Sequence, residues 1–329
     1  MIDRPADAYI RGLHYVGEGP EEDEPPVGDL LNSESVAQFI GLVYDGYAAA
    51  LGDHFGKTII GVFTDEPGWH GASLQTWFAE QGLRAAFVSL KECYVDLEAS
   101  ASGLSIPGFD GRLPNGAFVR GVPGGSLEEI VLRLDFLHQL AALGLPVFNS
   151  GRTIERTVDK AMTSLLLRHH DVPTPVTFVS ESVETAMEFV RRQLSLGRTL
   201  VKKPLFGSQG KGLRRVESPG DLTHLLPGEV AYLQEFIAIG DGPFCDCRVM
   251  VVDGEAIAAM ERRSHHWITN RAQGADCRSI PLQDKLAQLA ENAAAAVSAD
   301  YAGVDLMRTV DGNWLVTEVN GIPAWRGLQ

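Results

Sequence analysis

The fold is decided by one stretch near the end of the chain, Tyr301-Ala-Gly-Val-Asp-Leu-Met-Arg-Thr-Val-Asp-Gly-Asn-Trp-Leu-Val-Thr-Glu-Val-Asn320. Two apolar runs flank its Asp-Gly pair, which is the strongest short-range signal for a β-hairpin. With a two-residue turn at this pair, Asp305 is expected to lie directly opposite Glu318. Asn320 then points to the same face, because side chains alternate along a strand.

Two facing carboxylates and an amide oxygen predict a cation site on this hairpin. Like charges opposite each other repel, which costs stability unless a cation lies between them. An all-oxygen set suits Mg²⁺ (or Mn²⁺), and Mg²⁺ commonly takes its remaining ligands from phosphates and water. Taken alone, the pattern fits a solvated polar strand face equally well, so the interpretation depends on the rest of the chain.

The composition is that of a globular protein. The 329 residues are 45% hydrophobic and 22% charged, which is enough for two or three lobes with their own cores. No apolar run could span a membrane, and the N-terminus has no signal pattern, so we expect a cytoplasmic protein without a membrane partner. The spacing of the four cysteines predicts neither a disulfide nor a zinc site, so we interpret them as structural thiols.

The charge of the chain argues against a nucleic-acid partner. The net charge is −15, of which −8 falls in residues 1–57, where there are eleven Asp and Glu but three Lys and Arg. A small anionic ligand such as a nucleotide stays compatible, because local lysines and arginines set the field at a site.

The patterning divides the chain into four segments. Residues 1–57 read as an acidic, Pro-rich linker and a helix outside the core. Residues 58–150 alternate strands with helices, which predicts a parallel α/β domain. Residues 151–230 and 231–329 mix helices with antiparallel strands, so the fold class is α/β followed by two α+β lobes. Helices are expected over residues 35–51, 74–81, 126–143, 153–170, 183–194 and 282–297.

A second hairpin is predicted over Arg248–Glu261, again turned by an Asp-Gly pair. With a two-residue turn there, Asp246, Arg248 and Arg263 share one face. Arg262 falls on the other face with the apolar residues. The two arginines Arg248 and Arg263 belong either to a solvated ion-pair face, which contributes little to stability, or to a site that stabilises a transferred phosphoryl group.

A glycine-rich segment follows the apolar strand expected at 199–204. It reads Gly207-Ser208-Gln209-Gly210-Lys211-Gly212. Glycines let the backbone approach a ligand and expose N–H groups, and Lys203 just before them can neutralise phosphate charge. The segment lacks the features of a Walker A loop and of a dinucleotide fingerprint, and a flexible turn is the alternative.

Two further places are candidates for contacts with a nucleotide. Lys160 stands at the start of a helix and is either a surface lysine or a second phosphate cation. Glu235 and Phe236 lie at the end of an apolar strand that is either an ordinary strand or a hinge that reads the amino group of adenine.

In this order, the segments resemble the ATP-grasp superfamily and, within it, the RimK-type α-L-glutamate ligases. The resemblance runs from about residue 59 to residue 329 and is specific as a combination rather than in any one motif. The series is Asp159-Lys160, Val201 to Gly212, Leu233 to Ile237, Asp246-Cys-Arg248, Arg262-Arg263, Gly303-Val-Asp305 and Glu318-Val-Asn320. The resemblance implies an N-terminal α/β pre-ATP-grasp domain and two α+β lobes that hold ATP.

The resemblance also implies a reaction. A carboxylate takes the γ-phosphoryl group of Mg²⁺-ATP and becomes an acyl phosphate, which an amine, typically that of glutamate, attacks to form an amide. The expected partners are ATP, an amino acid and a carboxylate acceptor on a protein or cofactor. Relatives often form dimers or tetramers, so the oligomeric state of this chain is left open.

Site residues are carried over from the resemblance position by position. Arg248 and Arg263 match an arginine pair of the related glutathione synthetases and would steady the acyl phosphate. Asp305, Glu318 and Asn320 would bind the metal ion. The expected nucleotide contacts are Lys160, Lys203, Gly207, Ser208, Gln209, Gly210, Gly212, Glu235, Phe236, Asp246 and Asn270.

Three departures from the family pattern keep alternatives open. The chain stops at Gln329, where relatives usually continue into another helix; Ile268 stands where some relatives carry an arginine; and residues 1–57 have no counterpart in these ligases. The alternatives are a nucleotide-binding remnant without turnover and a glutathione-synthetase-like ligase.

Residues 36–67 also look like part of a barrel-type glycoside hydrolase, in which Glu66 would be one catalytic carboxylate. A glycosidase needs two carboxylates on a complete scaffold, and roughly sixty residues cannot supply a barrel. We therefore interpret residues 1–57 as an appended segment without glycosidase activity.

Overall fold

The computed structural model describes residues 59–63, 84–98, 101–207, 209–223, 229–238 and 243–323. The chain divides into two compact units, unit 1 (Met1–Glu155 with Ala299–Tyr301) and unit 2 (Arg156–Ser298 with Ala302–Gln329). The predictions for residues 1–57, the helix at 74–81, Glu66 and the end of the chain lie outside the described residues. No helix in the described ranges is both long and apolar enough to cross a membrane.

Unit 1 contains a parallel sheet, as the alternation of strands and helices predicted. Its strands lie in the order β2–β1–β5–β6 and all pair in parallel. Their bounds are β1 Ile59–Phe63, β2 Arg84–Val88, β5 Gly116–Val119 and β6 Val147–Phe148. The sequence did not predict the short 3-10 helix η4 (Leu90–Glu92) or the antiparallel pair β3 (Tyr94–Val95) and β4 (Leu104–Ser105).

The long helix of unit 1, α4 (Leu127–Ala142), begins where the sequence predicted. The Ser126 hydroxyl accepts a hydrogen bond from the Glu129 amide, and the Glu129 carboxylate accepts one from the Ser126 amide. This capping box satisfies two amides that the helix itself leaves unpaired. The buried side chains Phe136, Leu137 and Leu140 anchor the apolar face of the helix.

The helix expected over residues 153–170 is two helices, α5 (Gly151–Val158) and α6 (Lys160–His169). Asp159 interrupts it with an extended backbone, and its carboxylate accepts hydrogen bonds from the amides of Ala161 and Met162. An N-cap of this kind starts a new helix. The apolar periodicity missed the break because it continues on both sides, but the break makes Lys160 the first residue of α6.

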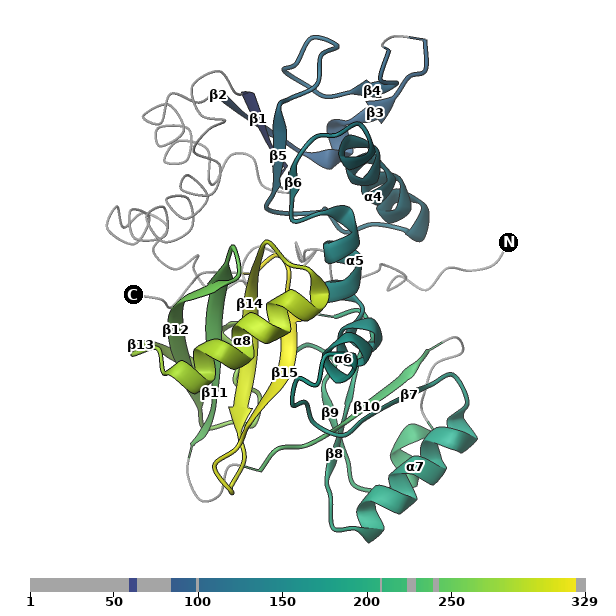
Figure 1. Cartoon of the computed structure of the whole chain (residues 1–329). Helices are drawn as coiled ribbons and strands as arrows, with labels where there is room; N and C mark the ends of the chain where they lie inside the picture. The colour runs from purple at the N-terminus through teal and green to yellow at the C-terminus, as the bar shows by residue number, and fades with distance from the viewer. Residues whose placement is uncertain are drawn as a thin grey trace. The chain divides into compact units, whose positions relative to one another are not determined.

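A four-stranded antiparallel sheet forms the first part of unit 2. Its strands lie in the order β7–β10–β8–β9, with β7 at Thr177–Ser180, β8 at Leu200–Lys203, β9 at Arg214–Val216 and β10 at Ala231–Glu235. Helix α7 (Val183–Ser195) packs on it, as Figure 1 shows, through the buried Ala186, Phe189 and Val190. The 3-10 helix η5 (Pro219–Leu222) adds Leu222 to this core.

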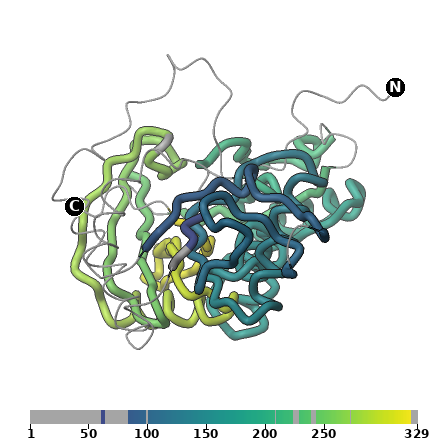
Figure 2. Tube along the Cα trace, turned by 90° about the horizontal axis from the view of Figure 1, so that it is seen from above, coloured from purple at the N-terminus to yellow at the C-terminus, as the bar shows by residue number. Residues whose placement is uncertain are grey.

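A five-stranded sheet forms the rest of unit 2, in the order β13–β12–β11–β14–β15, with antiparallel pairing from β13 to β11 and between β14 and β15. Its strands are β11 Phe244–Val252, β12 Glu255–Ser264, β13 Asp276–Ile280, β14 Tyr301–Arg308 and β15 Trp314–Asn320. Helix α8 (Asp284–Val297) lies across one face of the sheet, and the 3-10 helix η6 (Arg271–Gln273) precedes β13. Figure 2 traces β11 and β12 in green and β14 and β15 in yellow.

The hairpin β11–β12 turns at Asp253-Gly254, as predicted, and both residues have positive φ, 49° and 80°. The register then shifts, because Met250 pairs with Ala258 while Val251 pairs with Ala256, which leaves Ile257 as an extra residue. A bulge of this kind moves every later side chain of its strand to the other face. Asp246 therefore pairs with Arg262, and the prediction that Arg263 shares a face with Arg248 was wrong.

The hairpin β14–β15 pairs Asp305 with Glu318 and Gly303 with Asn320, as predicted. Its turn is one residue longer than expected, because the Thr309 amide bonds to the carbonyl of Asn313 across the loop. A bulge at Thr317 compensates, since Leu306 pairs with Val316 and Asp305 with Glu318. The longer turn and the bulge cancel each other, so Asp305 lies opposite Glu318, as the sequence predicted.

Candidate active site

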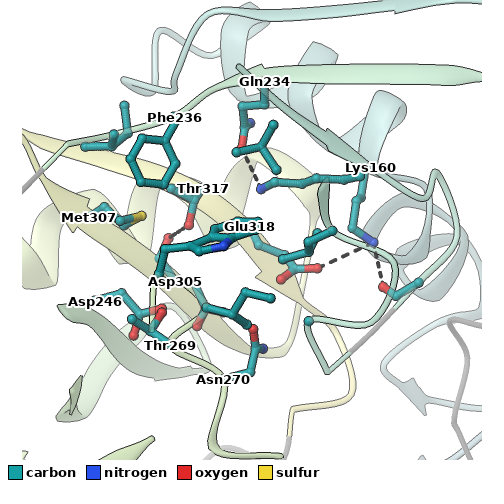
Figure 3. Close-up of a pocket in the computed structure, with 18 of the residues that line it drawn as sticks. Lys160, Gln234, Phe236, Asp246, Thr269, Asn270, Asp305, Met307, Thr317 and Glu318 are labelled. Carbon is teal, nitrogen blue, oxygen red and sulfur yellow. Dashed lines mark hydrogen bonds and ion pairs between the residues drawn. The ribbon is translucent and has the colours of Figure 1, made fainter. Parts of the chain in front are cut away.

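A pocket of about 860 Å³, including its open mouth, lies within unit 2 and is lined by residues of both sheets (Figure 3). The predicted site residues that line it are Lys160, Lys203, Gly207, Gln209, Gly210, Glu235, Phe236, Asp246, Asn270, Asp305 and Glu318. Ser208 lies outside the described residues. Gly212, Arg248, Arg263 and Asn320 are not among the lining residues.

Two lysines approach the pocket from different elements. At the start of α6, the Lys160 ammonium donates to the Gly207 carbonyl at 2.6 Å and lies 3.7 Å from a Glu318 oxygen. At the end of β8, the Lys203 ammonium donates to the Gln234 amide oxygen at 2.6 Å. Two ammonium groups on one pocket provide the charge that a polyphosphate requires.

Lys203 is the more perturbed of the two lysines. Burial, together with the nearby charge of Lys160, lowers the pKa of Lys203 to about 8, whereas the charge of Glu318 opposes the shift. Burial costs the ammonium its hydration, and within the described ranges its hydrogen-bond partner is the neutral amide of Gln234. Lys203 is therefore poised to gain an anionic ligand.

The glycine-rich segment packs closely against its surroundings. A Cβ on Gly210 would lie 2.6 Å from Ile268 Cγ2 and 2.7 Å from Asn270 Oδ1. Gly212 has φ of +74°, and a Cβ there would lie 2.7 Å from Pro204 Cγ. Both positions need glycine, Gly210 at the pocket and Gly212 as support behind it.

The other end of the pocket is apolar and aromatic. The Phe236 ring meets the Trp267 ring edge-on, with centroids 6.0 Å apart, and the Arg215 guanidinium lies 4.8 Å from the Phe236 centroid. The Glu235 carboxylate at this end lies 3.4 Å from Arg198 Nε. Apolar walls with a few polar groups at the edge suit a planar base.

The acidic end of the pocket holds a buried network of two aspartates and two arginines. Asp305 accepts from Arg248 Nε at 2.6 Å and from Arg248 Nη2 at 2.8 Å. Asp246 accepts from Arg262 Nε at 2.6 Å and Nη2 at 2.5 Å, and it also accepts from the Thr269 hydroxyl at 2.8 Å. Arg262 Nη2 lies 3.0 Å from Asp305 and so joins the two pairs.

The network splits the pKa values of its two carboxyl groups. Burial raises the pKa of Asp305, but Arg248 and Arg262 outweigh it and lower the pKa to about 2. Burial raises the pKa of Asp246, because it outweighs Arg262 and because the charge of Asp305 acts in the same direction. Asp305 is thus held as the carboxylate.

Arg262 occupies the place that the sequence analysis gave to Arg263. The Arg262 side chain is 4% exposed, whereas that of Arg263 is 46% exposed and bonds to Glu261 on the opposite face. The doubled Arg-Arg pair was visible in the sequence, but only the bulge at Ile257 decides which arginine points inward. Gln234, which holds Lys203, was also missed, since an amide on a strand gives no signal of its own.

The oxygen atoms of the β14–β15 hairpin fit a hard divalent cation. Asp305 and Glu318 face each other, and the Asn320 side-chain amide donates to the Gly303 carbonyl at 3.2 Å through its nitrogen, so its oxygen is not used in that bond. Among the described residues, no three His, Cys, Asp or Glu side chains gather, so a cation here would also need amide, phosphate or water oxygens. Proteins commonly bind Mg²⁺ through one or two carboxylates, with phosphate and water oxygens as the remaining ligands.

Comparison with known proteins identifies the family. Residues 157–329 match the RimK-like ATP-grasp domain. The tetrahydromethanopterin:α-L-glutamate ligase of Methanococcus maripaludis is 36% identical over 219 residues, which are 64% of this chain and 72% of that protein. The ribosomal protein bS6–L-glutamate ligase of Escherichia coli is 30% identical over 251 residues, 72% of this chain and 78% of that protein.

Solved structures agree on the fold. The ATP-grasp ligase PsnB, complexed with a minimal precursor, superposes with a TM-score of 0.64 at 21% identity, over 83% of this chain and 93% of that one. The D-alanine–D-alanine ligase of Bacillus anthracis superposes with a TM-score of 0.56 at 18% identity, over 83% and 88%. Together with the family match, these similarities show that the chain belongs to the RimK-like ATP-grasp family and is an ATP-dependent ligase that forms carbon–nitrogen bonds.

Proposed function

We propose that this ligase joins L-glutamate, through its amino group, to a carboxylate on a protein or cofactor, with Mg²⁺-ATP as the energy source. The observation that carries the proposal is that Lys160, Lys203 and the facing carboxylates Asp305 and Glu318 line one pocket. Curated relatives named as glutamate ligases support glutamate as the amine.

The chemistry proceeds in two steps. An oxygen of the acceptor carboxylate bonds to the γ-phosphorus of ATP, and the bond from phosphorus to the ADP oxygen breaks. The glutamate nitrogen then bonds to the carbonyl carbon, phosphate leaves, and the nitrogen loses a proton. Phosphoryl transfer requires positioning and charge neutralisation rather than a covalent catalyst, which matches the charged side chains of the pocket.

Each part of the pocket has a role in this reaction. Lys160 and Lys203 bind the phosphates, the glycine-rich segment covers them, and Phe236 with Trp267 bounds the base. Asp246 acts through Arg262, which it holds in place, rather than through a free carboxylate. Asp305, Glu318 and Asn320 would hold Mg²⁺, which neutralises phosphate charge when bound.

The proposal is tested by ADP formation from Mg²⁺-ATP and L-glutamate with a panel of carboxylate acceptors. The panel contains a ribosomal-protein C-terminal peptide, a reduced pterin cofactor and an amino-acid carrier protein. We expect ADP formation with one acceptor class only, and a mass increase of one glutamate residue on that acceptor. The exposed Glu255→Gln variant serves as the control and should match the native chain.

Two outcomes would contradict the proposal. Acceptor-dependent ADP formation with another amino acid, but not with glutamate, would support the ligase activity and refute glutamate as the amine substrate. A rise in melting temperature with Mg²⁺-ATP, but no ADP with any mixture, would favour a nucleotide-binding remnant.

A further inference from the structure

Asp305 stands out because its carboxylate already has two arginine partners. Arg248 holds it with two short hydrogen bonds of 2.6 and 2.8 Å, and Arg262 adds a single contact of 3.0 Å. The Asp305 side chain is 5% exposed. These donors take three of the roughly four lone-pair positions of the carboxylate, so a cation that binds Asp305 competes with them.

Glu318, which faces Asp305 across the hairpin, is in a different state. Within the described part of the chain, the cation that contacts it is the Lys160 ammonium at 3.7 Å, and its side chain is 29% exposed. It is therefore accessible to a cation from the pocket. Of the two facing carboxylates, Glu318 is the more accessible, and a cation at Asp305 competes with the arginine N–H groups already there.

The contact between Arg262 and Asp305 is the weakest in the network. It is a single contact, whereas the Arg248–Asp305 and Arg262–Asp246 pairs each have two bonds of 2.8 Å or less. Bidentate, charge-assisted pairs are stronger than single contacts. Arg262 also lines the pocket, whereas Arg248 does not.

We propose that Asp305 exchanges its Arg262 contact for the divalent cation, and that the freed N–H of Arg262 then receives the anionic group of the substrate. Asp246 keeps Arg262 in place through its two bonds during the exchange. Arg262 thus contacts the substrate directly and couples cation binding to anion binding. The inference rests on the cation site of the proposed function.

The coupling has a direct thermodynamic consequence. In the free protein, Arg262 and the cation compete for the same carboxylate, so Arg262 weakens cation binding. Once the cation neutralises Asp305, Arg262 has one negative partner instead of two, and its affinity for a substrate anion rises. By linkage, the anion strengthens cation binding to the same extent.

The test measures Mn²⁺ binding without nucleotide, by electron paramagnetic resonance of the free ion. Arg262→Gln should bind Mn²⁺ at least about tenfold more tightly than the native chain, because one charge in contact with Asp305 is gone. Lys203→Gln removes an equal charge that does not touch Asp305, and should tighten binding less than about threefold. Arg263→Gln, the neighbour on the opposite face, should change nothing.

A second measurement uses the native chain, because Arg262→Gln could fail to fold. The ¹⁵N side-chain signals of Arg262 should shift on titration with Mg²⁺, while those of Arg263 stay in place. The Arg262→Lys variant lacks the Arg262 signals and so identifies them in the native spectrum. Because it keeps the positive charge, it should tighten Mn²⁺ binding less than Arg262→Gln does.

The results separate the inference from the proposed function. Two results would overturn the inference and leave the ligase reaction intact. One is that Arg262→Gln tightens Mn²⁺ binding no more than Lys203→Gln does. The other is that the ¹⁵N signals of Arg262 do not shift at saturating Mg²⁺. Failure of the native chain and all variants to bind Mn²⁺, even with ATP, would reject the cation site itself and the inference with it.

Discussion

The hairpins β11–β12 and β14–β15 are neighbours in one sheet, carry the same Asp-Gly signal, and both deliver charged residues to the pocket. Each also contains one bulge between its turn and its charged residues. In β14–β15 a longer turn cancels the bulge, and in β11–β12 nothing does. The face of a strand residue therefore depends on every extra residue between it and the turn, and the turn alone cannot decide it.

The two bulges also differ in what they contribute locally. Thr317, the extra residue of β15, lines the pocket and donates its hydroxyl to the Asp305 carbonyl at 3.1 Å. Ile257, the extra residue of β12, is partly buried and does not line the pocket. The bulge at Thr317 thus supports the acidic pair, while that at Ile257 acts only by selecting Arg262.

The largest effect on stability is expected from replacing the inward-facing arginine of β11–β12. Arg262→Gln leaves two buried aspartates short of a positive partner and should lower the free energy of unfolding by about 3–5 kcal/mol. Arg263→Gln removes an exposed contact to Glu261 and should leave the free energy of unfolding almost unchanged. Urea unfolding of both variants checks this, and equal losses would show that the assigned faces are wrong.

The next effect belongs to the acidic pair of β14–β15. Glu318→Gln removes one of the two facing carboxylates and should lower acceptor-dependent ADP formation by about a hundredfold, with little loss of stability. The matched change in the other hairpin, Glu261→Gln, affects a carboxylate that faces away from the pocket and bonds Arg263 and Arg278. It should leave turnover within about twofold, because contacts of partly exposed ion pairs are weak. A comparable loss in both variants would mean that overall charge, not the facing pair, governs turnover.

The sequence predicted those parts of the site that depend on local pattern. The hairpins, the capped helix at Ser126 and the glycine-rich segment follow from turn residues, caps and alternation. The predicted pairing of Asp305 with Glu318 is correct because a longer turn and a bulge at Thr317 cancel each other. It failed where one residue changes a register or a helix. The break at Asp159 and the bulge at Ile257 leave no mark in hydrophobic periodicity, because the apolar pattern continues on both sides of the capping residue and a single extra residue in a strand carries no signal of its own.

Lys203 gives a smaller, pH-dependent effect beside β14–β15. Because burial lowers the pKa of Lys203 to about 8, its ammonium is lost above that pH, and ADP affinity should fall by up to about tenfold per pH unit. The stability of the ligand-free protein changes with pH in the opposite direction to its ADP affinity. The unfolded chain binds more protons between the folded value and 10.5, so the free energy of unfolding rises with pH there.

Calorimetric titration of ADP with Mg²⁺ from pH 7 to 9.5 measures the affinity. Lys203→Arg keeps its charge at every pH in this range and should flatten the profile. A native profile that is already flat would show that Lys203 does not carry its charge to the phosphates.

The smallest effect on stability is expected from the turn glycines of the two hairpins. Replacing them tests whether the turns or the bulges set the strand register. Gly254 and Gly312 have φ of 80° and 82°, so Gly254→Ala and Gly312→Ala should each lower the free energy of unfolding by about 1–2 kcal/mol. A Cβ on Gly312 meets only the mobile end of Arg308, at 3.3 Å, and one on Gly254 meets no atom within 4 Å, so neither adds a serious clash. If the bulges hold the register beyond the turns, both variants keep native ADP formation at 25 °C. A loss in Gly312→Ala as large as that in Glu318→Gln would instead assign the register of the acidic pair to the turn, because a changed loop would then carry Glu318 away from Asp305.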